Sequence, residues 1–417
     1  MTCIKAPAAR RWQNAAMRSV RFLCLLSPFA AAALAAEAPA TLADALARGK
    51  FSANLRARYE HVDQSALQDA DALTLRTRLG FTTADFHGFK AMIEGENIAA
   101  LDGDRYNQSG LNPAAAGRAV VADPETTELN QAWLAFTTGK TTATVGRQRL
   151  VLDQARFVGD VGWRQNMQTF DAAVLQDNSF TGTTLTYAYI DRVQRVFSSR
   201  HAQGHFDSDS HLFNARRAIA GLGTLTGYAY LIDFANAPAS SCATYGLSLA
   251  GDRALNPAFK LTYRAELARQ TDYRSSPLHY RTDYLALEAG LAAKSAGFAL
   301  GYEELGSDRG VSFRTPLATL HAYNGWADLF LTTPGNGLRD TYAKVTATLP
   351  AAVGFTGFWH AFTADRGGAD YGTELDLQLT RKFGPRLAAT AKYARFEHDL
   401  ATLPNVTKLW LQVEFTY

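Results

Sequence analysis

The sequence has no long apolar run after its first 36 residues. No later segment reaches the roughly 18 consecutive apolar residues that a membrane-spanning helix needs, so such helices are excluded there. Cysteine is also scarce, with three residues in 417. Cys3 and Cys24 lie near the start, so only Cys242 remains in the rest of the chain and a disulfide framework is excluded. We interpret Cys242 as a small apolar filler on a strand.

The chain carries little excess charge of either sign. Its formal net charge of +3 comes from 42 basic and 39 acidic residues. Five of the bases, and no acid, lie in residues 1–35, so the rest of the chain holds 37 bases against 39 acids. No overall basic field is present to attract nucleic acid, and we expect no nucleic-acid partner. Arginine outnumbers lysine. The guanidinium group of arginine stays charged and binds carboxylates with two parallel hydrogen bonds, so the positions of the arginines are more informative about function than the total charge.

Catalytic and metal-binding motifs are missing as well. The one spacing typical of a metal site is His201-x-x-x-His205, which lies in a polar Ser/Asp/Gly segment and is interpreted as solvated. No Gly-x-Ser-x-Gly motif and no phosphate-binding loop occurs. We therefore predict no catalytic residue, no metal and no cofactor, and the protein is not expected to be an enzyme.

Residues 1–36 have the pattern of a secretory signal peptide. A basic region with Arg10, Arg11, Arg18 and Arg21 precedes the apolar residues 22–33, and Ala33-Leu34-Ala35 offers a cleavage site. Met17 is an alternative start to Met1. Residues 37–50 are predicted to form a short linker with a brief helical turn at Thr41–Leu46.

From residue 51 onward the chain alternates between apolar and polar residues. The last ten residues show it best: one face holds Leu409, Leu411, Val413, Phe415 and Tyr417, and the other holds Lys408, Trp410, Gln412, Glu414 and Thr416. Side chains of a β-strand point alternately to opposite faces, so this pattern predicts a strand with one apolar face. Such a strand at the very end of a chain suits the closing strand of an outer-membrane barrel. A half-buried edge strand of a soluble sheet is the alternative.

Eighteen such segments follow one another between residues 52 and 417, joined alternately by short turns and longer connections. The longer connections are expected near residues 100–126, 151–167, 192–210, 304–340 and 397–406. A further candidate strand, His321–Leu331, would make the number odd, so we place it inside a long loop. The prediction is an all-β fold: residues 51–417 form a single 18-stranded antiparallel transmembrane β-barrel in contact with outer-membrane lipid. Sixteen or twenty strands are the alternatives.

Charged residues of the first three strands share the polar phase of the pattern. Arg56, Arg58, Arg76 and Arg78 are expected to face the lumen, with the counter-charges Glu60, Glu94 and Glu96 nearby. A ring of fixed cations would offset the desolvation cost of a passing anion, and the carboxylates would hold each guanidinium in place. The alternative is that these Arg–Glu pairs only rigidify the wall.

Residues 125–175 resemble the alginate-export family of outer-membrane barrels. The matching runs are Glu128-Leu129-Asn130-Gln131-Ala132-Trp133-Leu134, Gly146-Arg147-Gln148, Arg156-Phe157, Trp163-Arg164-Gln165-Asn166 and Thr169-Phe170-Asp171. The resemblance implies an 18-stranded barrel in the bacterial outer membrane with an arginine-lined pore for an anionic polysaccharide, and it leaves room for periplasmic export partners. It carries the pore-lining role onto Arg147, Arg149, Arg156 and Arg164, with Asp171 as a counter-charge.

Residues 151–167 are the candidate constriction, because Phe157 and Trp163 would anchor an inward-folded loop against the wall. An ordinary external loop is the alternative. The function predicted from these observations is a passive outer-membrane channel for an anionic, alginate-like saccharide or polysaccharide. A general anion-preferring diffusion porin and a barrel enzyme are the alternatives.

Overall fold

The computed structural model describes residues 39–417, and the predicted signal peptide lies outside them. A short helix, α1 (Leu42–Ala47), precedes the first strand. Thr41 caps it, because the Thr41 side chain accepts a hydrogen bond from the Asp44 backbone N–H at 3.1 Å. The predicted helical turn is therefore confirmed. None of the helices in residues 39–417 has the length and apolar character needed to span a membrane.

Nearly all the remaining regular secondary structure is antiparallel sheet, and eighteen of the twenty strands belong to one sheet. These eighteen are β1 (Lys50–Gln64), β2 (Ala70–Thr82), β3 (Phe89–Ala100), β4 (Thr126–Thr138), β5 (Thr141–Gln148), β6 (Thr169–Asp177), β7 (Thr183–Gln194), β8 (His205–Ile219), β9 (Gly223–Ile232), β10 (Cys242–Ala254), β11 (Lys260–Asp272), β12 (Arg281–Ala292), β13 (Ala296–Leu305), β16 (Leu338–Leu349), β17 (Val353–Thr363), β18 (Asp370–Phe383), β19 (Leu387–His398) and β20 (Val406–Thr416). The other two, β14 (Ser307–Asp308) and β15 (Val311–Ser312), form a small separate hairpin.

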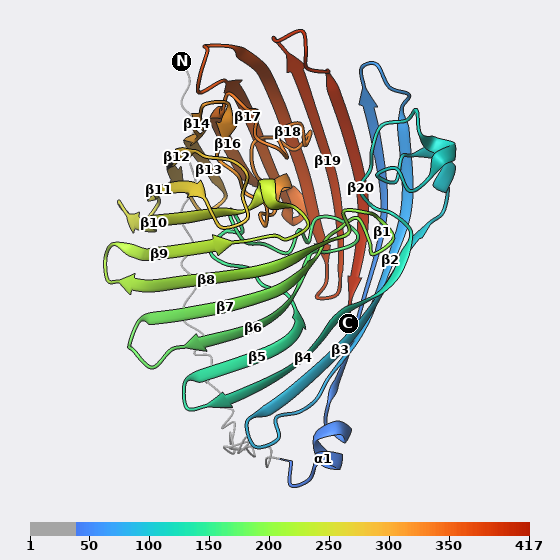
Figure 1. Ribbon diagram of the computed structural model, residues 1–417, viewed down its shortest axis with the longest axis vertical. Helices are drawn as coiled ribbons and strands as arrows, with labels where there is room; N and C mark the ends of the chain where they lie inside the picture. Colours follow the sequence, from blue (N-terminus) through green and yellow to red (C-terminus); the bar gives the residue numbers. More distant parts are fainter. Residues whose placement is uncertain (1–38) are drawn as a thin grey trace, which may run out of the picture. The chain divides into compact units, whose positions relative to one another are not determined.

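The large sheet closes on itself, because β20 pairs with β1 as well as with β19. The register of the closing pair places Leu411 opposite Tyr59 and Glu414 opposite Arg56. Beyond the last strand, the Tyr417 backbone N–H donates to the Ala53 carbonyl at 2.8 Å. Figure 1 shows the blue strand β1 beside the red strand β20, with the other strands following in chain order around the wall. The predicted 18-stranded barrel is confirmed.

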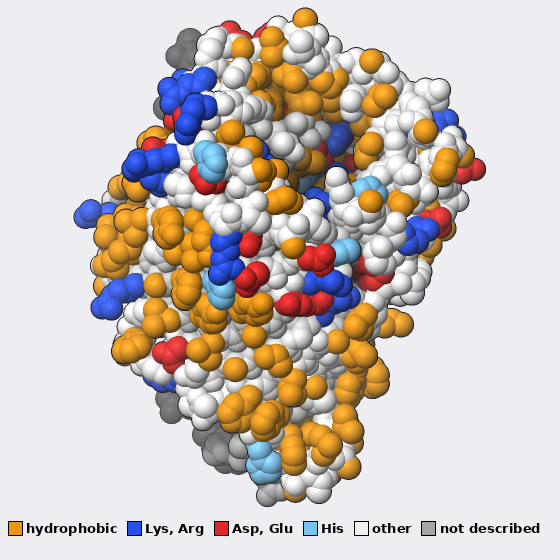
Figure 2. All heavy atoms as spheres, in the orientation of Figure 1, with side chains coloured by type: hydrophobic (Ala, Val, Ile, Leu, Met, Phe, Trp, Pro, Cys, Tyr) orange, Lys and Arg blue, Asp and Glu red, His pale blue; other side chains and the backbone are white. Residues whose placement is uncertain are grey.

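The two faces of the wall differ as the alternation predicts. On β20, Leu411 and Val413 are about half exposed on the outside, whereas Trp410 and Lys408 are buried inside. The same division recurs on other strands, so that large apolar side chains cover much of the outer surface, as Figure 2 shows in orange. A barrel that spans a membrane needs an apolar outer band in contact with lipid, and its interior can be polar.

The connections alternate in length as predicted, with a few shifts of boundary. The connection between β7 and β8 covers only residues 195–204, because β8 begins at His205 rather than near residue 211. Residues 321–331 form no strand and lie inside the long connection between β13 and β16, as predicted. Both chain ends of the barrel, at β1 and β20, stand at the short-turn end, which is the periplasmic end of outer-membrane barrels.

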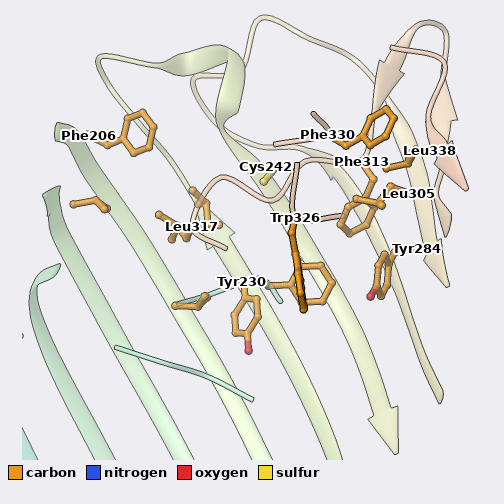
Figure 3. Packing of buried hydrophobic residues seen from close by; sticks show 14 of the residues in the cluster. Phe206, Tyr230, Cys242, Tyr284, Leu305, Phe313, Leu317, Trp326, Phe330 and Leu338 are labelled. Carbon is orange, nitrogen blue, oxygen red and sulfur yellow. The ribbon is translucent and has the colours of Figure 1, made fainter. Parts of the chain in front are cut away.

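The interior of the barrel is packed by long connections that fold inward. Five short 3₁₀ turns lie in the connections between strands: Gly103–Arg105, Pro113–Ala115, Pro238–Ser240, Leu320–Ala322 and Pro350–Ala352. The last of them forms the tight turn between β16 and β17. Figure 3 shows Phe313, Leu317 and Trp326 of the β13–β16 connection packed among side chains of the wall such as Tyr230 and Tyr284. The packed interior therefore joins loop residues to the inner face of the strands.

Candidate functional site

The connection between β5 and β6, residues 149–168 (the β5–β6 loop), crosses the inside of the barrel. Its middle pairs with the connection between β13 and β16, residues 306–337 (the β13–β16 loop), through a bridge between Val158 and Leu317. The Gly159 backbone N–H donates to the Leu317 carbonyl at 2.8 Å, and the Thr319 N–H donates to the Ala155 carbonyl at 3.0 Å. The inward folding predicted for residues 151–167 is thus confirmed over the external-loop alternative, and its role as the constriction of a pore stays a prediction.

Four predicted arginines hold the second half of this loop against the wall of β1 and β2. Arg56 donates to the carbonyls of Gly162, Trp163 and Arg164 at 3.1 to 3.3 Å, and Arg58 donates to the Trp163 carbonyl at 2.6 Å. Arg76 and Arg78 donate to the Gln165 carbonyl at 3.5 and 3.1 Å. All four side chains are buried. They satisfy carbonyls that would otherwise lack partners in an irregular segment away from water.

Trp163 is the aromatic anchor of this half of the loop. The Arg58 guanidinium lies over its ring at 4.1 Å from the centroid, and the His321 ring stacks on it at 4.6 Å with an interplanar angle of 2°. Trp410 of β20 meets the Trp163 ring edge-on at 5.8 Å. The anchoring role predicted for Trp163 is therefore confirmed.

The inner tip of the β5–β6 loop is fixed to the opposite wall. Phe157 packs against Tyr228, Tyr284 and Phe313 at ring distances of 5.1 to 5.8 Å. Beside it, Arg156 Nε lies 2.7 Å from Glu303 Oε1 on β13. Burial opposes the charge of Arg156, but Glu303 outweighs burial and raises the pKa of Arg156 above its usual range. Phe157 is the second predicted anchor, and it too is confirmed.

Asp328 of the β13–β16 loop bonds to two cations from other parts of the chain and to one histidine of its own loop. Its Oδ2 accepts from Arg164 Nη2 at 2.7 Å and from Lys408 Nζ at 2.9 Å, and its Oδ1 lies 2.7 Å from His321 Nδ1. Lys392 of β19 lies 2.7 Å from the other nitrogen of His321, so Lys392 donates and the imidazole accepts. This Asp328 cluster ties both inward loops to β19 and β20.

Electrostatics keep Asp328 charged and His321 neutral. Burial by itself opposes ionisation of Asp328, but the hydrogen bond from His321 and the charges of Lys408 and Arg164 outweigh burial and hold its pKa well below its usual range. Burial also lowers the pKa of His321 well below its usual value, and Lys392 adds to this effect while Asp328 only partly offsets it. The cluster is therefore a carboxylate compensated by two fixed cations and a neutral imidazole.

A recess of about 310 Å³ lies on the short-turn side of the β5–β6 loop, and four of the predicted arginines line it. These four are Arg56, Arg76, Arg78 and Arg149, and the acids in the lining are Glu94, Asp160 and Glu414. We call it the arginine recess. Arg56 and Arg76 share one carboxylate oxygen, Glu414 Oε1, at 3.3 and 3.0 Å. The Nε atoms of both are buried and have no hydrogen-bond partner among residues 39–417.

The predicted charges not yet described pair within the wall and the loops, and Arg149 and Glu94 have further partners besides lining the recess. Arg147 makes a two-pronged pair with Asp171 at 2.7 and 2.9 Å, and Arg149, half exposed, lies 2.5 Å from Asp160. Of the counter-charges, Glu60 pairs with Arg164 at 3.2 Å and Glu96 pairs with Arg78. Glu94 accepts from the side chains of Asn130 and Gln131 instead. The eight arginines thus divide between the recess, the wall and buried ion pairs.

Sequence reasoning missed several members of the networks that hold these arginines. They are Asp123, Asp160, Glu303, His321, Asp328, Lys392, Lys408 and Glu414. Lys408 and Glu414 stand on the polar face of the last strand, so the alternation offered a signal for both. Asp123 and Asp328 lie in irregular loops, where no period indicates which way a side chain points.

A closed wall that is apolar outside and polar inside, with loops folded into its interior, defines an outer-membrane β-barrel channel. The chain belongs to the alginate export family, whose model matches residues 48–272, from just before β1 to the end of β11. The protein is therefore located in the bacterial outer membrane. A comparison with curated protein sequences found no match.

Solved structures support the same architecture over nearly the whole chain. The barrel is similar to OccK9 (OpdG) of Pseudomonas aeruginosa, with a TM-score of 0.72 and 15% identity, covering 89% of this chain and 100% of that one. It is also similar to OccAB4 of Acinetobacter baumannii, with a TM-score of 0.70 and 14% identity, covering 88% and 98%. At such low identity the likeness concerns the fold alone. It extends the fold assignment to the strands that follow residue 272.

Proposed function

We propose that this channel passes an anionic saccharide or polysaccharide, such as a polyuronate, along a lumen that presents arginines to its carboxylates. The arginine recess supports this proposal most directly. Two guanidinium groups there share a single carboxylate oxygen, so the pair has an excess positive charge next to two unpartnered N–H groups. A carboxylate entering the recess would supply the missing acceptor, and charge-assisted hydrogen bonds of this kind are strong.

Interleaved acids in the same recess would keep the site from binding too tightly. Glu94, Asp160 and Glu414 line it together with the arginines. Conduction requires binding that is favourable enough for entry and weak enough for release, so a mixed lining suits transport better than a purely basic one. Membership of the alginate export family agrees with an anionic saccharide as the substrate. Periplasmic export partners stay a prediction.

A second candidate, an anion-preferring diffusion porin for small solutes, is favoured by the attachment of the β5–β6 loop. The loop is tied to β1 and β2 at one side and to Glu303 of β13 at the other. A polymer would have to pass beside a loop that is fixed at both sides, whereas a small anion needs only a narrow passage.

Recordings from single channels in planar bilayers test these candidates. We expect anion selectivity in a salt gradient and block of the current by polyuronate oligomers added at the short-turn side. The double substitution Arg56→Gln and Arg76→Gln should weaken both effects, and Glu414→Gln should strengthen anion preference. Arg217→Gln, an exposed arginine of β8, is the matched control and should change neither.

Three outcomes separate the candidates. Anion selectivity with block by small anions but not by polyuronate oligomers favours the diffusion porin. Reversal potentials that do not respond to the Arg56 and Arg76 substitutions contradict the role given to the arginine recess. Absence of any conductance from correctly assembled barrels favours the third alternative, a barrel enzyme.

A further inference from the structure

A second cavity, of about 450 Å³, lies under the β13–β16 loop on the inner side of the wall from β10 to β17. Its walls carry aromatic rings from both the loop and the strands: Tyr323, Trp326, Tyr342 and Phe358. We call it the aromatic cavity. The residues that line the arginine recess come from β1 to β4, the β5–β6 loop and the C-terminal residues of and after β20, so the two spaces have no lining residue in common. The volume lies within the range of about 300–1,000 Å³ typical of small-molecule sites.

The rings of the aromatic cavity are held in place by their surroundings. Phe358 lies 5.5 Å from Trp326 and 6.0 Å from Tyr342 between ring centroids. Tyr342 lies over Gly301 of β13, where any Cβ atom would overlap its ring. The aromatic wall is therefore preorganised rather than formed by side chains that are free to move.

Polar groups of both kinds stand beside these rings. Glu288 of β12 accepts from the Tyr342 hydroxyl through Oε2 at 2.7 Å, and its Oε1 has no hydrogen-bond donor among residues 39–417. Lys344 of β16 has its ammonium group 5.4 Å from the Phe358 ring centroid, and no carboxylate in the described chain pairs with it. A free acceptor and a free donor thus flank one aromatic face.

The charged groups of the aromatic cavity do not suit a ligand that binds through a carboxylate alone. Besides Glu288, the acids Glu303 and Asp340 line the cavity, and the cations in the lining are Arg264 and Lys344. Arg264 is already engaged by Glu266 at 2.5 Å. A bare carboxylate would therefore meet repulsion from Glu288 as well as attraction to Lys344. A hydroxyl group, which both donates and accepts, satisfies both residues at once.

We propose that the aromatic cavity is a binding subsite for a pyranose ring, recognised by its hydroxyl groups and its apolar ring face rather than by charge. The ring face would pack on Phe358 and Trp326, Glu288 would accept from one hydroxyl, and Lys344 would donate to another. Aromatic surface combined with a few directed polar groups is the general composition of such pockets. The inference rests on the proposed function in taking a saccharide as the substrate, but it assigns ring recognition to a different wall of the lumen.

Current block by the neutral disaccharide cellobiose tests the subsite, because this probe has pyranose rings and hydroxyls but no charge. We expect cellobiose added at the short-turn side of wild-type channels to interrupt the current transiently. Glu288→Gln and Phe358→Leu should each weaken this block at least about fivefold, as expected when a charge-assisted hydrogen bond or a ring contact is lost. Phe298→Leu, on the outward face of β13, is the matched control and should block like the wild type.

The outcomes are distinct from those that test the arginine recess. Wild-type channels that are anion-selective but show no cellobiose block would overturn the subsite and leave the proposed function standing. Cellobiose block in channels without anion selectivity would support the subsite and contradict the proposed function. If Phe358→Leu does not assemble, Glu288→Gln alone decides: unchanged block in that variant overturns the assignment.

Discussion

Arg156, at the inner tip of the β5–β6 loop, lies 2.7 Å from Glu303 on the far wall of the barrel, and both side chains are buried. The two residues are 147 positions apart in the chain. This pair holds the loop at one side of the lumen. At the other side, four arginines of β1 and β2 donate to carbonyls of the loop: Arg56, Arg58, Arg76 and Arg78. The loop separates the arginine recess from the aromatic cavity, because Asp160 and Gly162 line the first and Gln154 lines the second.

Breaking this pair should release the tip of the loop. Arg156→Gln leaves the Glu303 carboxylate buried without its cation, a change that costs about 3–5 kcal/mol in other proteins. We expect a lower temperature of heat-induced unfolding and a larger, noisier single-channel conductance. Glu303→Gln combined with Arg156→Gln should recover part of the stability, because no uncompensated charge remains. A single variant as stable as the wild type would contradict the role of the pair.

Removing the half-exposed cation of the arginine recess should change selectivity more than stability. Arg149 has a side chain that is 52% exposed, and it pairs with Asp160 at 2.5 Å. Water screens the half-exposed Arg149, and the buried Asp160 still accepts a hydrogen bond from the Gly162 N–H at 3.1 Å, so Arg149→Gln should assemble normally. We expect its anion preference to fall roughly twofold at low ionic strength and the difference from wild type to shrink near 1 M salt, where the screening length is about 3 Å. Reversal potentials measured across a salt series provide the check.

The Asp328 cluster should weaken as the pH falls below the ordinary pKa of histidine, about 6.5. His321 has a lowered pKa in the folded protein, so below that value the unfolded chain binds a proton that the folded chain excludes. The stability that neutral His321 contributes is therefore full above about pH 6.5 and is lost as the pH falls toward the folded-state pKa. The carboxylate of Asp328, whose pKa is also lowered, stays ionised through this range.

Heat-induced unfolding followed between pH 8 and pH 5 measures this effect. The wild type should lose stability on acidification, and His321→Gln should lose less over the same range. Exposed His279 is a suitable control, because its side chain is 83% exposed and His279→Gln should follow the wild-type curve. Identical pH profiles for wild type and His321→Gln would show that the cluster does not depend on neutral His321.

Deletion of residues 415–417 should prevent closure of the barrel. Phe415 pairs with Leu55 of β1 and with Leu387 of β19, and Tyr417 exchanges backbone hydrogen bonds with Ala53 at 2.8 and 3.2 Å. Without them the last strand loses its pairing at the short-turn end and leaves unpaired backbone groups at an edge. We expect little heat-modifiable barrel from the deletion variant. Tyr417→Phe keeps the backbone pairing and should assemble, so normal assembly of the deletion variant would contradict the account.

The sequence by itself determined the wall of this protein. A period of two is a local property, so the alternation of Leu409 to Tyr417 and of the seventeen segments before it could be read without knowing any distant contact. The length of the connections then gave the even number of strands and placed residues 321–331 in a loop. The inward direction of Arg56 and Arg76 followed from the same alternation, and the motifs around Gly146 to Asp171 pointed to the family and to the constricting loop.

Only the tertiary structure decided what the arginines touch. Arg164 meets Asp328 across 164 positions of the chain, and Arg56 meets Glu414 across 358, so neither pair leaves a local signal. The inward loops have no period, because irregular backbone takes its direction from the carbonyl and side-chain partners that it finds on the wall. Closure of the barrel brings those partners together, and it therefore decides which arginines hold a loop, which line a recess and which do both.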